Sequence, residues 1–132
     1  ARSGRLRNRR TIRRRNARVF VDLFRGDERF VIQRENGRSS WFAFTIVLNP
    51  ALPLDRARIL AALKQARIEY RIVTGGCFLR HDVIKFFDYD CPGPIVHANT
   101  VHDRGFFVGN HPFDLTPQLH RLREVLDAAA RL

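Results

Sequence analysis

Residues 70–82 read Tyr-Arg-Ile-Val-Thr-Gly-Gly-Cys-Phe-Leu-Arg-His-Asp, and this stretch is the most informative in the chain. The run from Tyr70 to Val73 predicts a short strand, and the two glycines after it predict a turn. Glycine at such a turn allows a positive φ and lets another group approach closely, because it has no Cβ. We therefore expect a strand that passes through a tight turn into the start of a helix.

The side chains around this turn are suited to an anionic or polyhydroxylated ligand. Guanidinium groups form forked hydrogen bonds with carboxylate, phosphate or sugar oxygens, and unpaired N–H groups at a helix start favour anions. The predicted substrate-binding residues are therefore Arg71, Gly75, Gly76, Arg80 and His81. The alternative is an ion-paired strand arginine, two ordinary turn glycines and a solvated first helical turn.

The remaining sequence predicts a small α+β domain. Helical patterns cover 5–24, 55–67, about 82–87, a segment up to 102, and the end from 116; strand patterns cover 30–33, 41–48, 70–73 and 106–108. The continuously apolar run from Trp41 to Leu48 is typical of a central strand covered on both faces. This order predicts a sheet of three or four strands with helices packed against it.

Terminal signals and buried faces are expected at particular positions. Gly26 is expected to end the first helix, whereas Asp55 and Thr116 are expected to cap the second and the last. The core faces predicted for the second and last helices are Ile59, Leu60, Leu63, Ala66, Leu119, Leu122, Val125, Leu126 and Ala129.

Positive charge is concentrated near the beginning of the chain. Residues 1–38 contain 13 arginines and four acidic residues, while the whole chain has a net charge of +11. A stand-alone basic module that binds nucleic acid is one interpretation. The other is an arginine-rich amphipathic helix, because Leu6, Ile12, Phe20 and Phe24 recur at helical spacing and no aromatic residue precedes Phe20. We favour the helix and expect no specific nucleic-acid partner.

Length and composition indicate one globular domain. The chain has 132 residues, of which 45% are hydrophobic, and it contains two cysteines. This is enough to bury a core, and no apolar run approaches the roughly 20 residues that a membrane-spanning helix needs. Two cysteines do not suggest a secreted disulfide scaffold. We expect a cytoplasmic protein without a membrane partner.

Three motifs together resemble a known enzyme family. Ser40-Trp41-Phe42-Ala43-Phe44, Thr74 to Val83, and Val101 to Asn110 are similar to the C-terminal part of the DegT/DnrJ/EryC1 family of vitamin-B6-dependent sugar enzymes. Within it they resemble the dehydratase branch, although Ala43 replaces a glycine. The sugar aminotransferases of the family tend to carry an aromatic- and proline-rich loop in place of Gly75-Gly76-Cys77, and that difference favours the dehydratases.

The resemblance implies a fold and a division of the chain. It implies the small C-terminal domain of an aspartate-aminotransferase-type enzyme of fold type I. Residues 1–26 would be a connecting helix and residues 27–132 the small domain, with the large cofactor-binding domain absent. The chain would then be a fragment.

The resemblance also implies an activity for the parent enzyme. A pyridoxal or pyridoxamine phosphate (PLP/PMP) cofactor would remove the C3 hydroxyl of a nucleotide-linked 4-keto-6-deoxyhexose, as in deoxysugar biosynthesis for bacterial cell-surface polysaccharide. Glutamate would regenerate the cofactor, and the enzyme would be a homodimer. A nucleotide-sugar aminotransferase is the alternative. The fragment alone is expected to be inactive and to bind no cofactor, because its only lysines, Lys64 and Lys85, have surface patterns.

Other polar residues and one apolar stripe allow further hypotheses. Asn99, His102 and Asn110 could hydrogen-bond a ligand. Zinc is not expected, because the cysteines and histidines at 77, 81, 91, 97 and 102 lack a paired Cys-x2-Cys motif. Finally, the apolar stripe around Phe20 and Phe24 is expected to be exposed without the large domain, and to make the fragment self-associate.

Overall fold

The computed structural model describes residues 2–131, with only the backbone described for residues 2–7, so the side chain of Leu6 lies outside the described part. The elements in chain order are α1 (Arg2–Phe24), β1 (Phe30–Ile32), β2 (Ala43–Leu48), α2 (Arg56–Gln65), β3 (Tyr70–Ile72), the short 3-10 helices η1 (Phe78–Arg80) and η2 (Asp82–Phe86), α3 (Val96–Arg104), β4 (Gly105–Gly109) and α4 (Thr116–Ala129). The predicted order of helices and strands is confirmed, except that a further 3-10 helix, η1, lies between β3 and η2.

The four strands form one antiparallel sheet in the order β1-β2-β4-β3. Phe44 of β2 lies opposite Val108 of β4, and Ile46 lies opposite Phe106. β2 is hydrogen-bonded on both sides, so its predicted central place is confirmed. The α+β class with a four-stranded sheet is also confirmed.

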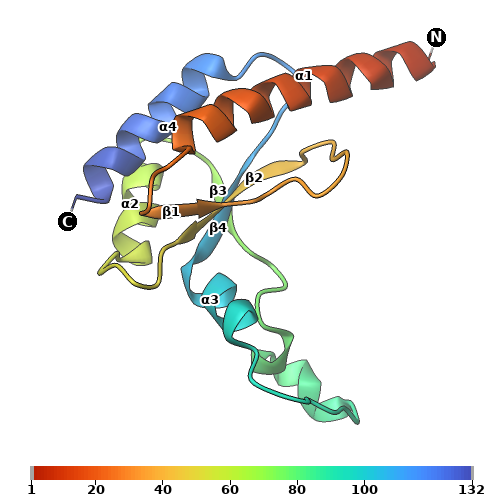
Figure 1. The fold of residues 1–132 in the computed structure, drawn as a ribbon, viewed down its shortest axis with the longest axis vertical. Coiled ribbons are helices and arrows are strands. Elements are labelled where there is room, and N and C mark those ends of the chain that lie inside the picture. Colours follow the sequence, from red (N-terminus) through yellow and green to blue (C-terminus); the bar gives the residue numbers. More distant parts are fainter. Residues whose placement is uncertain (1, 132) are drawn as a thin grey trace.

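Helices α1, α2 and α4 cover one face of this sheet (Figure 1). Phe44, Ile46 and Leu48 point into the buried layer, whereas the alternate positions of β2 are half-buried. The expectation that β2 is covered on both faces is therefore wrong. Residues i and i+2 of a strand share a face, and the packed helices cover only the face that these three residues occupy.

The aromatic residues of α1 belong to the core. Phe20 is 0% exposed and Phe24 is 2% exposed. The Phe20 ring is stacked 4.7 Å from that of Phe44, centroid to centroid. The expectation that these two side chains form an exposed docking surface is wrong, because the sheet and α4 provide enough apolar surface to bury them.

Caps and turns define where the helices begin and end. The Asp55 carboxylate accepts a hydrogen bond from the Ala57 amide at 2.8 Å, as expected, and Gly26 follows α1 with φ of +75°. Thr116 is the first residue of α4 rather than its cap. The reason is the preceding Asp114, whose carboxylate accepts from both the amide and the hydroxyl of Thr116.

The predicted helical core faces are largely confirmed. In α4 the predicted residues Leu119, Leu122, Val125, Leu126 and Ala129 are all buried. In α2 Ile59 and Leu63 are buried, whereas Leu60 and Ala66 are half-buried at the edge of the layer.

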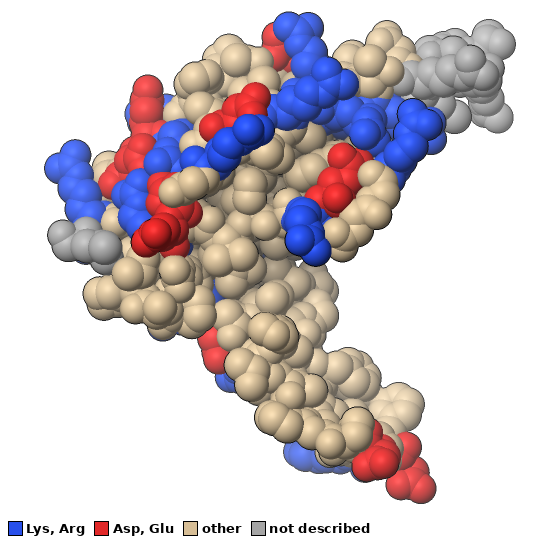
Figure 2. All heavy atoms as spheres, viewed as in Figure 1, with Lys and Arg blue, Asp and Glu red and all other residues tan. Residues whose placement is uncertain are grey.

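Residues 78–96, here called the arm, project away from the rest of the molecule, here called the body (Figure 1). The large apolar side chains exposed along the arm are Phe78, Val83, Phe86, Phe87, Tyr89 and Val96. Figure 2 shows Lys and Arg side chains gathered over α1 and the helical side of the body, while most of the arm is uncharged on this face. None of the helices in the described range 2–131 is both long enough and apolar enough to span a membrane.

Candidate functional site

The Gly75–Gly76 turn is built around the imidazole of His102. Gly76 has φ of +47°, and a Cβ added to it would lie 2.5 Å from Nδ1 of His102. The Cys77 amide donates a hydrogen bond to the same Nδ1 at 3.2 Å. Because an amide N–H can only donate, Nδ1 is the unprotonated nitrogen and the ring proton of neutral His102 is on Nε2. The close approach that glycine allows here is therefore made by His102.

Arg80 and His81 lie beside this turn. His81 Nε2 donates to the carbonyl of Gly75 at 2.9 Å, and the His81 and His102 rings are 6.0 Å apart, edge to face. Arg80 Nη1 is 2.6 Å from Oδ1 of Asp103, and this hydrogen bond lowers the pKa of the Asp103 carboxyl. Four predicted site residues thus meet two residues of α3. We call Gly75, Gly76, Arg80, His81, His102 and Asp103 the turn cluster.

The position of His102 depends on the end of α3. Arg56 of α2 donates from Nη1 to the carbonyl of His102 at 2.8 Å and to that of Gly105 at 3.2 Å. A Cβ on Gly105 would lie 2.5 Å from the carbonyl oxygen of Val101, so the α3–β4 junction requires glycine. The two hydrogen bonds from Arg56 therefore satisfy carbonyls at the C-terminal end of α3, where a helix leaves its last carbonyls without partners.

The turn cluster can donate hydrogen bonds to an oxygen-rich ligand. His102 makes no hydrogen bond through Nε2 within the described part of the chain, and Arg80 retains donors beyond the one bound to Asp103. Nucleophilic chemistry at Cys77 is not supported, because this side chain is 1% exposed.

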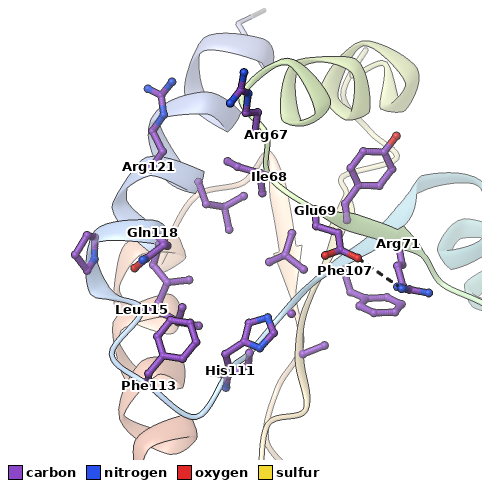
Figure 3. Close-up of a pocket in the computed structure, with 18 of the residues that line it drawn as sticks. Arg67, Ile68, Glu69, Arg71, Phe107, His111, Phe113, Leu115, Gln118 and Arg121 are labelled. Atoms are coloured by element: carbon purple, nitrogen blue, oxygen red, sulfur yellow. Dashed lines mark ion pairs between the residues drawn. The ribbon is translucent and has the colours of Figure 1, made fainter.

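Arg71 lies apart from the turn cluster. It lines a pocket of about 860 Å³ between α4 and the β3–β4 edge of the sheet (Figure 3), and none of the other four predicted site residues lines that pocket. Its guanidinium is 3.5 Å from the carboxylate of Glu69, and both side chains are mostly exposed. The predicted residues therefore fall in two places.

Asn110 and Asn16 form a buried network that holds the body together. Asn110 is 3% exposed; its amide donates to the carbonyls of Arg13 and Trp41, and its side-chain oxygen accepts from Asn16. Asn16 in turn accepts from the amide of Leu115. Asn110 is thus a structural residue, and its binding of a ligand stays a hypothesis. No local pattern marks Asn16, which stands in an arginine-rich helix.

A second polar network joins α1's end to α4. Asp27 accepts hydrogen bonds from Arg29 and Arg123, and Asp127 accepts from the same two arginines. The hydrogen bond from the Arg29 side chain is the main cause that holds the pKa of the Asp27 carboxyl far below its ordinary range. Sequence patterns did not reveal this network, because its members are almost 100 residues apart.

Neither lysine and none of the described His, Cys, Asp or Glu side chains is arranged as a cofactor or metal ligand. Lys64 is exposed on α2, and Lys85 is bonded to Asp82 in the exposed arm at 2.8 Å, so neither amine faces an enclosed site. Asn99 is half-buried in α3. Among the residues that the structure describes, no three His, Cys, Asp or Glu side chains gather in a way that could hold a metal ion.

Comparison with solved structures identifies the class. A DegT/DnrJ/EryC1/StrS aminotransferase from Brucella abortus superposes on 90% of this chain with a TM-score of 0.72, and its 17% identity shows the fold alone. No family model matches the sequence. The similar solved structures are PLP-dependent enzymes of fold type I, and this chain has the fold of one part of them.

Two sequence relatives carry the name of one dehydratase. The chain is 40% identical over 116 residues to the GDP-4-keto-6-deoxy-D-mannose 3-dehydratase of Yersinia pseudotuberculosis, covering 87% of the chain and 30% of the relative. The enzyme of that name from Escherichia coli O55:H7 is 37% identical over 117 residues, covering 88% and 30%.

A solved structure of the E. coli dehydratase with bound hydrated PLP is similar to this chain as well. It matches 93% of this chain, which spans 32% of that protein, with a TM-score of 0.89 and 35% identity. The chain is therefore similar to GDP-4-keto-6-deoxy-D-mannose 3-dehydratases along most of its own length, and it spans about a third of theirs.

Proposed function

We propose that this chain serves as the small C-terminal domain of a nucleotide-sugar 3-dehydratase. The observation that carries the proposal is the likeness to GDP-4-keto-6-deoxy-D-mannose 3-dehydratase, at 35% identity and a TM-score of 0.89 over 93% of the chain. The substrate is a GDP-linked 4-keto-6-deoxyhexose that loses its C3 hydroxyl. The aminotransferase from Brucella abortus is far less similar, at 17% identity.

In this proposal the cofactor is held outside the described residues. Bound PLP or PMP supplies the electron sink for loss of the C3 oxygen. Residues 1–26 connect to a cofactor-binding domain, and residues 27–132 form the domain that covers the sugar. A related structure contains a PLP-glutamate geminal diamine, which supports glutamate as the source of reducing equivalents. The assembled enzyme is a cytoplasmic homodimer.

The turn cluster is the part of this chain that contacts the sugar. His102 presents Nε2–H as a donor, because Nδ1 is occupied by the Cys77 amide. Arg80 adds charged donors beside it while the Asp103 carboxylate holds its orientation. Donors held by such second contacts orient an oxygen ligand better than mobile surface side chains do.

A chimera tests this proposal directly. This chain replaces the corresponding part of the E. coli relative, and the purified chimera is given PLP, glutamate and GDP-4-keto-6-deoxymannose. Mass spectrometry then follows the sugar. We expect a product that has lost the C3 oxygen, with glutamate consumed. An amino sugar that retains the C3 oxygen would show an aminotransferase instead, and a folded, PLP-loaded chimera without turnover would refute the proposal.

Two variants of the chimera separate the turn cluster from the rest of the domain. His102→Gln keeps a polar side chain but loses the imidazole donor, and we expect kcat/KM to fall about tenfold or more, which corresponds to one hydrogen bond in the transition state. Arg58→Ala is the matched control, because Arg58 is exposed on α2 away from both the cluster and the pocket. If the two variants have equal kcat/KM, the turn cluster does not bind the substrate.

A further inference from the structure

The pocket between α4 and the β3–β4 edge has walls suited to a flat apolar molecule. Tyr70 and Val108 line it on the sheet side, and Leu119 and Leu122 line it on the α4 side. The rings of His111 and Phe113 lie at the end opposite Arg67 (Figure 3), nearly parallel at 15° and 5.6 Å apart. Its volume of about 860 Å³ falls in the range of roughly 300–1,000 Å³ that is usual for small-molecule sites.

The charges around the pocket are mainly positive. Its lining contains Arg13, Arg67, Arg71 and Arg121, against the single carboxylate of Glu69, which pairs with Arg71. Arg67 and Arg121 lie at the same end of the pocket (Figure 3). Arg121 is 3.4 Å from the exposed carboxylate of Glu124, a pair too solvated to neutralise this end.

Arg13 adds a polar atom that lacks a partner. Its Nε is buried and makes no hydrogen bond within the part of the chain that the structure describes. A buried donor without a partner is rare in folded proteins. Arg13 lines the pocket, and its carbonyl is bonded to Asn110 close to His111.

The backbone at Arg67 is unusual for an arginine. Arg67 follows the end of α2 with φ of +57°, and the amide of Ile68 bonds back to the carbonyl of Leu63 at 2.9 Å. Glycine is the usual residue at this left-handed position after a helix. The turn itself therefore does not require arginine, and the Arg67 side chain lines the edge of the pocket.

We propose that this pocket binds a planar aromatic anion. The aromatic body lies between the sheet and α4, and its phosphate, sulfonate or carboxylate pairs with Arg67 and Arg121. The site is separate from the turn cluster, so the proposal holds whether or not the chain belongs to a dehydratase. A nucleotide and a simple aromatic acid share this chemistry.

An NMR titration of the full 132-residue chain tests the proposal. The probes are GDP, 8-anilino-1-naphthalenesulfonate, the uncharged 1-naphthol, and inorganic phosphate. We expect saturable shifts of the amides at 66–71 and 109–119 with at least one of the two aromatic anions, and binding at least tenfold weaker for 1-naphthol and for phosphate. Saturation by GDP identifies a nucleotide site, and saturation by the sulfonate alone identifies a site for another aromatic acid.

Two arginine variants that are expected to stay folded test the binding site itself. Arg121→Ala and Arg67→Gly should each weaken binding about tenfold, the effect of one charge-assisted hydrogen bond, while Arg58→Ala leaves it unchanged. Arg67→Gly should also keep or raise the thermal midpoint, because glycine suits the left-handed backbone. The proposal is overturned if 1-naphthol binds as tightly as the anions, if shifts appear only in the arm, or if neither variant weakens binding.

Discussion

The body and the arm bury apolar side chains to opposite extents. In the body, Phe20, Phe44 and Phe106 are completely enclosed between the sheet and the helices. In the arm, Phe86 is 86% exposed, and no residue of η1 or η2 is buried. Burial of a large apolar side chain contributes about 1.5–3 kcal/mol, so the body is stabilised by its own contacts and the arm is not.

This difference in burial shows which part of the chain is stabilised by contacts within the chain. Exposed aromatic residues that cluster on one projection are typical of a surface that contacts another domain or subunit. The relatives are about three times as long as this chain, which fits a domain whose arm contacts residues outside it. The body buries its large apolar side chains, and the arm leaves them exposed.

The largest contrast should appear between two phenylalanine truncations. Phe44→Ala removes a fully buried ring and should lower the free energy of unfolding by about 3–5 kcal/mol. Phe86→Ala is the matched change in the arm and should alter it by less than about 0.5 kcal/mol. Urea denaturation followed by circular dichroism measures both. A comparable loss in the two variants would mean that the arm is packed in solution.

The second largest loss of stability is expected from the buried amide network of Asn16 and Asn110. Asn110→Ala leaves the carbonyls of Arg13 and Trp41 without their shared donor, and we expect a loss of about 2–3 kcal/mol in the free energy of unfolding. Asn99→Ala is the control, because Asn99 is half-buried in α3 and its side chain makes no hydrogen bond to the described residues. Denaturation midpoints that coincide for the two variants would contradict the structural role of Asn110.

Asp27 should give the body a dependence on pH that the arm lacks. Its folded-state pKa is lowered from the ordinary 3.8, so the ionised form stabilises the fold above about pH 4, and this contribution is lost as the pH falls toward the folded value. Asp27→Asn should cost about 2 kcal/mol at pH 7, with the gap from the parent narrowing below pH 4. Asp82→Asn in the arm is the control and should have the free energy of unfolding of the parent at pH 7 and at pH 2. If Asp27→Asn is less stable than the parent by the same amount at both pH values, this account is contradicted.

The smallest expected effect lies at the junction of body and arm. Gly76→Ala places a Cβ against His102 at a positive φ, and we expect a loss of about 1 kcal/mol together with faster amide exchange at Cys77. Gly75→Ala meets no atom within 4 Å and serves as the control. Hydrogen exchange followed by NMR measures both, and unchanged protection at Cys77 in Gly76→Ala would rule out the close contact.

Periodicity predicted the elements well and their surroundings less well. The core face of α4 could be predicted completely, because apolar side chains three and four residues apart mark one side of a helix. The half-burial of one face of β2 and the complete burial of Phe20 could not be predicted, because both depend on which helices cover which face of the sheet. Those contacts join residues far apart in the chain, and no local pattern encodes them.

The candidate site was predictable in part for the same reason. The glycine turn and its neighbours Arg80 and His81 are contiguous, so the sequence itself shows them together. Arg71 is only four residues before Gly75, yet it lines the pocket rather than the turn cluster, because it precedes the turn on strand β3. His102, which completes the cluster, is 25 residues from Cys77, and nothing in the local sequence connects the two.

The contacts at the base of the arm also determine how it can move. Arg56 holds the carbonyls of His102 and Gly105, and Arg104 reaches the carbonyls of Asn49, Leu52 and Leu54. Both guanidinium groups lie where α3 meets the body, and the far loop around 88–94 has no comparable attachment. These two arginines therefore anchor α3, from which the arm projects, through backbone carbonyls on both sides of its junction with the body.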